Sequence, residues 1–182
     1  RRELFRSVEE GVTDDLWNAL QVIDQGARVV FEPGAIARIP TPSRSAGHEL
    51  RRRRRVVARS LRGLLLMRRL MNPLRTRFFA IGLFVNKVMR RGLPFFLAGL
   101  LISSALLAES SVVFLALTVA QLAGLALALG YPIVRRLPLG PIVKLSSVGF
   151  YFFIGNLGTL LGVFDFLRGK RVVVWEPKKS GR

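Results

Sequence analysis

Cysteine is absent from this chain, and histidine occurs only once, at His48. Without cysteine there is no disulfide framework and no thiolate metal site, and one histidine cannot form the clusters that hold zinc. Acidic residues are also scarce: 11 Asp and Glu stand against 29 Lys and Arg in 182 residues, a formal net charge of +18. These absences exclude disulfide-stabilised domains and zinc sites built from cysteine or histidine clusters.

The strong positive charge is combined with high hydrophobicity, because 51% of the residues are hydrophobic. A nucleic-acid-binding protein would explain the charge but not the apolar content, whereas a membrane protein with basic cytoplasmic flanks explains both. A membrane-tethered nucleic-acid binder is also disfavoured, since few aromatic residues accompany the arginines and no binding fold is recognisable. We therefore expect a lipid bilayer as a partner and no nucleic acid.

Two adjacent carboxylates, Asp14 and Asp15, begin a predicted helix that extends to about Gln25. Thr13 is a suitable N-cap, and Gly26 is suited to end the helix. Acidic residues are favoured at the positive end of a helix dipole. The acid pair therefore has an ordinary explanation in helix formation, and any catalytic role has to be compatible with it.

Two short extended patterns follow this helix. "RVVFE" at residues 28–32 is rich in β-branched residues, and "AIARI" at residues 35–39 precedes two prolines. One helix and two short strands are too little to build a core. We therefore expect residues 1–47 to be the C-terminal part of an α/β domain, with the rest of that domain upstream.

The next segment, from Glu49 to about Met71, is an arginine-rich helical pattern, which the dipeptide Asn72-Pro73 ends. Its apolar residues form one stripe: Leu50, Val57, Leu61, Leu64 and Leu65. Residues 74–92 mix phenylalanine with lysine and arginine, which is typical of a helix lying in the membrane interface. We expect residues 48–92 to form amphipathic interfacial helices.

Residues 93–167 contain three apolar segments, predicted as transmembrane helices at about 93–109, 112–130 and 145–165. The third contains four glycines and Asn156. Asn156 is expected to form a hydrogen bond between closely packed helices; the alternative is a substrate contact. Residues 168–182 form a basic tail. Three full crossings would place this tail opposite the arginine-rich helix, against the positive-inside rule, so the topology stays open.

The order of these motifs resembles the C-terminal part of bacterial family 2 membrane glycosyltransferases of the processive, cellulose- and hyaluronan-synthase-like type. The motifs that carry the resemblance span the chain: "RRELF", "VTDD", "GARVVFEPGAIARI", "ELRRRRRVVARSLRGLL" and "VVVWEP". The resemblance implies an α/β fragment, the C-terminal piece of a GT-A Rossmann-like domain, followed by interfacial helices and an all-α membrane region. It also implies a multi-pass protein of the inner (plasma) membrane whose catalytic part is cytoplasmic.

The resemblance assigns roles to four residues. In this family a Thr-Glu-Asp-type motif begins a helix at the acceptor site, and its last carboxylate is the general base; by position Asp15 matches this base and Asp14 its acidic neighbour. The family's Gln-x-x-Arg-Trp motif, which binds the acceptor end and the donor diphosphate, aligns with Arg52 and Arg55. Val56 replaces its Trp, which removes a stacking surface for sugar and favours a shorter or lipid-linked acceptor.

The implied activity is inverting transfer of a sugar from a nucleotide-sugar donor to a polysaccharide or lipid-linked acceptor. The implied cofactor is Mg²⁺ or Mn²⁺, whose ligands, like the nucleotide-binding aspartates, are expected upstream, so the isolated chain is expected to be inactive. The alternative is a non-catalytic membrane transport or assembly subunit in which the arginines are positive-inside anchors. That alternative leaves "VTDD" and "GARVVFEP" unexplained.

Overall fold

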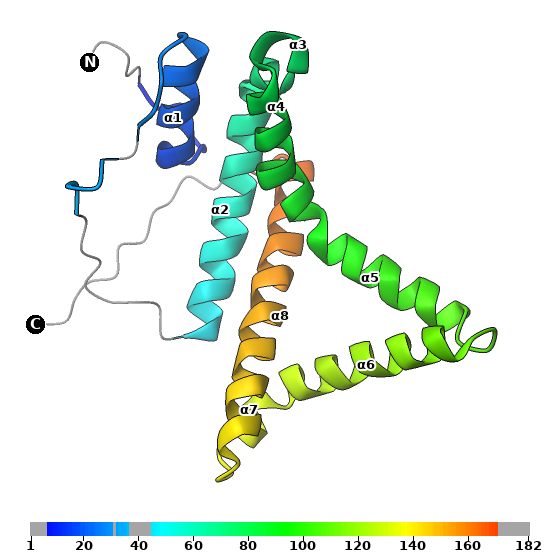
Figure 1. Ribbon diagram of the computed structural model, residues 1–182. Helices are drawn as coiled ribbons and strands as arrows, with labels where there is room; N and C mark the ends of the chain where they lie inside the picture. Colours follow the sequence, from blue (N-terminus) through cyan, green and yellow to red (C-terminus); the bar gives the residue numbers. More distant parts are fainter. Residues whose placement is uncertain (1–6, 31, 37–44, 171–182) are drawn as a thin grey trace, which may run out of the picture.

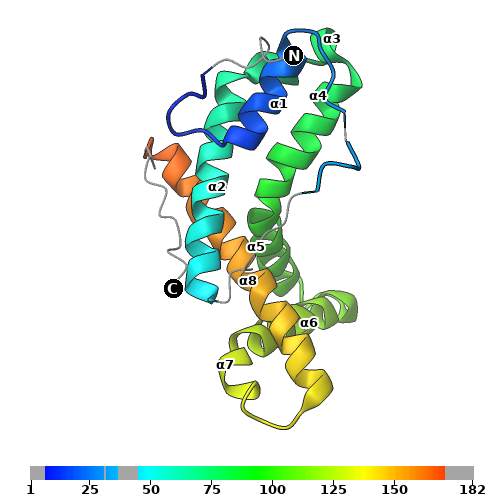
Figure 2. The same cartoon turned by 90° about the vertical axis from the view of Figure 1, so that its left-hand side faces the viewer.

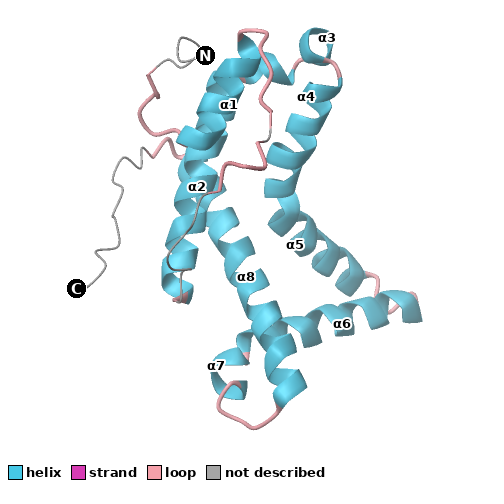
Figure 3. Cartoon of the chain, turned by 60° about the vertical axis from the view of Figure 1, so that its left-hand side comes forward, coloured by secondary structure: helices cyan, strands magenta, loops and turns pink. Residues whose placement is uncertain are grey.

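A computed structural model describes residues 7–30, 32–36 and 45–170, and within these ranges every regular element is a helix (Figures 1 and 3). The amino-terminal helices are α1 (Asp14–Asp24), α2 (Ala46–Leu66), the 3₁₀ turn η2 (Arg68–Met71) and α3 (Pro73–Thr76). The remaining helices are α4 (Phe78–Leu83), the π-helical segment η3 (Phe84–Met89), α5 (Arg90–Leu106), α6 (Val112–Leu129), α7 (Tyr131–Val134) and α8 (Gly140–Leu167).

The predicted α/β fragment, a piece of a GT-A Rossmann-like domain, is wrong for this chain, because the described residues contain neither strand nor sheet. Residues 28–30 of the expected first strand have no regular structure, and Val30 is 80% exposed. A strand is stabilised by a partner that satisfies its backbone N–H and C=O groups, and none is present in the described ranges. Residues 37–39 of the second expected strand, "RRELF" and "VVVWEP" lie outside the described residues.

A small hydrophobic core joins α1 to α2, and Figure 2 shows the two helices side by side. Trp17 and Leu20 of α1 pack with Leu64 of α2, together with Met67 and Leu70 just beyond α2. Trp17 and Leu20 are three positions apart and therefore lie on one face of α1. All five side chains are at most 7% exposed, so this core fixes the position of α1 on α2.

Helix α2 also packs along α8, at a contact made possible by two glycines. A Cβ atom added at Gly162 would lie 2.6 Å from the carbonyl oxygen of Arg54 and 2.7 Å from Cβ of Val57. A Cβ atom added at Gly158 would lie 2.7 Å from Cβ of Arg53. Small residues spaced four apart let two helix backbones approach closely, as in membrane helix pairs.

The expected hydrogen bond from Asn156 to a neighbouring helix is not formed. Its Nδ2 atom instead donates to the carbonyl oxygen of Phe152 in the same helix, at 2.9 Å. The packing of α8 against α2 therefore depends on its glycines and not on a hydrogen bond from Asn156. Asn156 instead lines two cavities, which are described below.

Three helices are long and apolar enough to cross a membrane: Phe78–Leu106, Val112–Leu129 and Gly140–Leu167. This supports the predicted association with a lipid bilayer. The first of them is one continuous helix made of α4, η3 and α5, so the sequence-based division at residue 92 falls inside it. With 28 residues, α8 is about 42 Å long at about 1.5 Å per residue, which exceeds a hydrocarbon core of about 30 Å.

The continuous helix bends where η3 meets α5 (Figure 1). Pro94 lies inside α5 and cannot donate a backbone hydrogen bond to the preceding turn. The π-helical segment Phe84–Met89 immediately precedes α5. Proline and π-helical turns are the usual causes of helix kinks, and here they coincide.

Candidate functional site

The acid pair lies at the start of α1, where Asp14 and Asp15 are the first two helical residues and both are exposed. Thr13 occupies the N-cap position, but its side chain makes no capping hydrogen bond. Gly26 follows the helix with φ of 76°, and its N–H donates to the carbonyl oxygen of Ile23 at 3.0 Å, so the predicted helix end is confirmed. Helix α1 therefore holds both carboxylates at a defined helix start.

Arg59 connects the start of α1 to α2. Its Nε atom donates to the carbonyl oxygen of Val12 at 2.7 Å, and its Nη2 atom lies 3.6 Å from Oδ1 of Asp14. Asp15 has no ion-pair or hydrogen-bond partner within the described part of the chain. Both acids are exposed, but they differ in their partners: Asp14 faces Arg59, whereas Asp15 makes no ion pair or hydrogen bond with a described residue.

Arg52 and Arg55 share one face of α2 with Arg59, because the three positions are separated by three and four residues. The side chain of Arg52 is 59% exposed, and its Nη1 atom lies 3.4 Å from Oε2 of Glu49. Arg55 is half-buried and makes no ion pair with any described residue. The structure therefore brings Arg55 within about one turn of the arginine at the acid pair, whereas Arg52 lies two turns away. Sequence reasoning missed Arg59, although its spacing from Arg52 and Arg55 is a signal that identifies it.

The other arginines of the run have different partners. Arg54 forms a two-pronged ion pair with Asp165 of α8: its Nη2 atom lies 2.8 Å from Oδ1, and its Nε atom donates to Oδ2. This hydrogen bond holds the pKa of Arg54 above its usual value, against the opposing effect of desolvation. The Nε atom of Arg53 donates to Oε1 of Glu49 at 3.1 Å. Arg54 therefore attaches α2 to α8, a role the sequence did not indicate.

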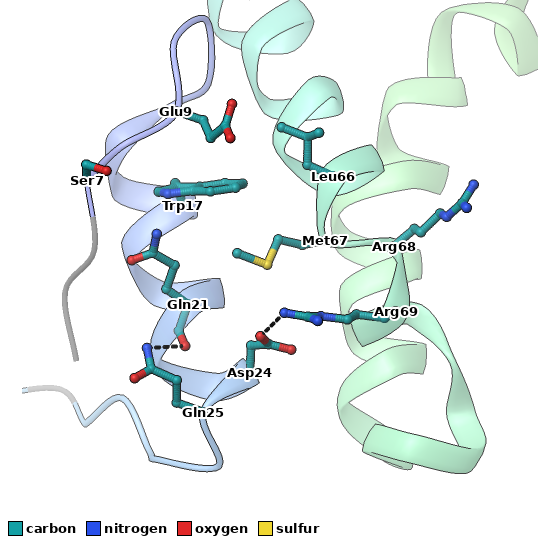
Figure 4. A pocket seen from close by; sticks show the side chains of 10 residues that line it. All are labelled: Ser7, Glu9, Trp17, Gln21, Asp24, Gln25, Leu66, Met67, Arg68 and Arg69. Carbon is teal, nitrogen blue, oxygen red and sulfur yellow. Dashed lines mark hydrogen bonds and ion pairs between the residues drawn. The ribbon is translucent and has the colours of Figure 1, made fainter.

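A cavity of about 530 Å³ lies between α1 and the end of α2 (Figure 4). Trp17 and Gln21 line it from α1, and Asp24 at its edge is paired with Arg69. Neither acid of the pair at the helix start lines this cavity. Trp17 is only 7% exposed and belongs to the core, so it does not replace the stacking surface lost at Val56.

The described residues do not fit a divalent metal ion. No group of three or more His, Cys, Asp or Glu side chains that could hold an ion occurs among them. Mg²⁺ and Mn²⁺ are bound through several oxygen ligands, and Asp14 already faces the positive charge of Arg59. The Mg²⁺ or Mn²⁺ implied by the resemblance is therefore not assigned to these residues.

Comparisons of the chain with protein-family models, with curated proteins and with solved structures give no match.

Proposed function

We propose that this chain provides the acceptor side of a membrane-bound glycosyltransferase, which transfers a sugar from a nucleotide-sugar donor to a polysaccharide or lipid-linked acceptor with inversion. One observation carries the proposal: the start of α1, with the acid pair, contacts Arg59 of α2, and Arg55 lies one turn from Arg59 on the same helix face. A carboxylate beside guanidinium groups is the combination that proton removal and diphosphate binding require.

In the proposed reaction Asp15 is the general base. One of its carboxylate oxygens takes the proton of the acceptor hydroxyl, and that hydroxyl oxygen attacks the anomeric carbon of the donor. The bond from the anomeric carbon to the diphosphate breaks, and the nucleoside diphosphate leaves with the electron pair. Asp15 suits this role because it is exposed and has no ion-pair or hydrogen-bond partner among the described residues, whereas Arg59 lies 3.6 Å from Asp14.

Arg52 and Arg55 are proposed to bind the departing diphosphate. A planar guanidinium presents paired donors that match two phosphate oxygens. Arg55 is the better placed of the two, since it has no ion-pair partner among the described side chains and lies one turn from Arg59. To bind the diphosphate, Arg52 would have to give up its ion pair with Glu49. Exposed ion pairs of this kind are weak in water, so the loss would cost little.

The resemblance places the donor-binding aspartates and the ligands of Mg²⁺ or Mn²⁺ upstream of Arg1. Transfer is therefore assayed in the longer polypeptide that contains them, and the isolated chain is expected to insert into membranes without transferring sugar. The arginine-rich α2 favours an inner-membrane protein whose catalytic part faces the cytoplasm, by the positive-inside rule. Sugar transfer by the isolated chain would contradict the proposal that the donor-binding residues lie upstream of it.

Single alanine substitutions across Arg51 to Arg55 separate a substrate role from a lipid-anchor role. Arg55→Ala, and to a smaller extent Arg52→Ala, are expected to weaken donor binding or transfer about tenfold to hundredfold, because a charge-assisted phosphate contact contributes about 1.5–3 kcal/mol. The exposed Arg51 is the matched control and should have little effect. Arg54→Ala should lower stability through the loss of Asp165 pairing. Donor affinity, transfer rate and melting temperature are measured separately.

A flat profile, with all five variants mild and no difference between Arg55 and Arg51, would contradict the proposed phosphate role. It would favour the alternative, a non-catalytic membrane subunit anchored by its arginines, for which about 1 kcal/mol of membrane affinity per cation is expected.

A further inference from the structure

A basic cavity of about 330 Å³ lies where α2, η3, the start of α5 and α8 meet. Among the described residues, no acidic side chain lines it, and four cationic ones do: Arg53, Lys87, Arg90 and Arg91. The only carboxylate bound to any of the four is that of Glu49, which accepts from Arg53, within the described part of the structure. Positive charges gathered in one cavity attract an anion, since a counter-charge relieves their mutual repulsion.

Arg91 lines this cavity and is held in place from α2. Its Nη2 atom donates to Oγ of Ser60 on α2, a residue that is 3% exposed. A guanidinium held at the wall of a cavity can bind the acceptor oxygens of an anion. Phosphate supplies several such oxygens in a geometry that suits guanidinium.

An apolar cavity of about 510 Å³ lies between α5, α6 and α8, the three helices that form the sides of a triangle in Figure 1. Most of the residues that line it are apolar, among them Leu97, Leu101, Leu125 and Leu160. All three helices belong to segments that are long and apolar enough to cross a membrane. A hydrocarbon chain is the ligand chemistry that fits this lining.

The two cavities share one turn of α8 in their walls, because Phe152 and Asn156 line both. We propose that these two adjoining cavities bind one phosphate-bearing membrane lipid, with its phosphate in the basic cavity and its hydrocarbon chain in the apolar cavity. Basic pockets between membrane helices are a general way of binding anionic lipid headgroups. This inference does not depend on sugar transfer, and its test needs no donor.

Charge and position together favour a lipid over other occupants. A soluble phosphate would satisfy the cations but would leave the adjoining apolar cavity unfilled. A helix from another protein or a second copy would fill the apolar cavity but would leave Lys87, Arg90 and Arg91 without a counter-charge. Only a molecule with both an anionic end and an apolar end matches both linings.

Native mass spectrometry of the purified 182-residue chain in detergent tests the proposal. The probes are phosphatidylglycerol, diacylglycerol with the same chains, and glycerol phosphate. We expect one phosphatidylglycerol to bind, with at least tenfold weaker binding of diacylglycerol and of glycerol phosphate. Each of these two probes lacks one half of the proposed ligand.

Two pairs of variants test the two halves of the site. Combined Lys87→Gln and Arg90→Gln substitutions should weaken phosphatidylglycerol binding at least tenfold, whereas the matched pair Arg135→Gln and Arg136→Gln, both exposed and outside the cavity, should not.

Gly124→Leu places a side chain in the apolar cavity, where an added Cβ meets no heavy atom within 4 Å, and should weaken lipid binding tenfold. Gly99→Leu is its control, because its added Cβ is equally unobstructed but Gly99 is not among the residues that line the cavity.

Three outcomes would overturn the proposal. Glycerol phosphate binding as tightly as phosphatidylglycerol would indicate a soluble-anion site. Equal effects of the cavity variants and their controls would indicate lipid bound elsewhere on the apolar surface. A stable dimer that excludes phosphatidylglycerol would show that a second copy fills the apolar cavity.

Discussion

Replacing Asp15 by asparagine in the proposed glycosyltransferase, the longer polypeptide that would include the donor-binding half, is expected to lower sugar transfer about 10²- to 10⁴-fold, the usual contribution of a general base. The amide keeps the shape of the side chain but cannot accept the proton of the acceptor hydroxyl. Binding of the nucleotide sugar should stay nearly unchanged, because in the proposed reaction Asp15 acts on the acceptor. The transfer rate at saturating donor and the donor dissociation constant are the two quantities to measure.

Asp14→Asn is the matched control, since both residues occupy the first turn of α1 and both substitutions remove one negative charge from it. Its effect should be milder, because Asp14 faces Arg59 instead of being uncommitted. Near-normal transfer by the Asp15 variant would contradict the general-base role, and Asp14 and Asp15 would then serve only to stabilise the start of α1.

Gly162→Ala is expected to lower the stability of the chain by about 1–3 kcal/mol, the usual effect of overpacking a close contact. The added Cβ would lie 2.6 Å from the carbonyl oxygen of Arg54, and a backbone atom cannot yield without moving α2 away from α8. The same movement would strain the ion pair between Arg54 and Asp165. Thermal unfolding in detergent measures the effect.

Gly155→Ala is the control for this prediction, because an added Cβ at Gly155 of the same helix meets no heavy atom within 4 Å. It should leave the melting temperature unchanged or raise it slightly, since alanine favours helix more than glycine does. Equal melting temperatures for the Gly162 and Gly155 variants would show that α2 and α8 do not pack closely in the folded protein.

Features set by local sequence were predictable. The acid pair and Gly26 indicated the two ends of α1. Asn72-Pro73 indicated a helix break, and it separates η2 from α3; Oδ1 of Asn72 accepts from the N–H of Leu74 there at 2.9 Å. The arginine-rich helix, however, was expected to reach about Met71 and ends at Leu66. The apolar segments indicated membrane helices from composition alone. Each of these signals lies within one or two turns of the element that it specifies.

Features set by distant partners were not predictable. The expected strand at residues 28–32 depended on a neighbouring strand, and residues 28–30 are without one in the described structure. Arg54 was indistinguishable in sequence from its neighbours until α8 brought Asp165 to it, 111 residues along the chain. The basic cavity lined by Arg91 and the apolar cavity likewise form only when residues of α5 and α8, far apart in the sequence, are packed together.

The central claim is that the start of α1 and the arginine face of α2 form one site, and a double-mutant cycle tests it most directly. The transfer rate of the longer polypeptide is measured with Asp15→Asn, Arg55→Ala and both, beside a control cycle with Arg51→Ala. Residues that act as one unit have non-additive effects. We predict that the double variant loses clearly less than the product of the two single losses, whereas the Arg51 cycle is multiplicative. A multiplicative Asp15 and Arg55 cycle, or transfer unaffected by either substitution, would contradict the claim.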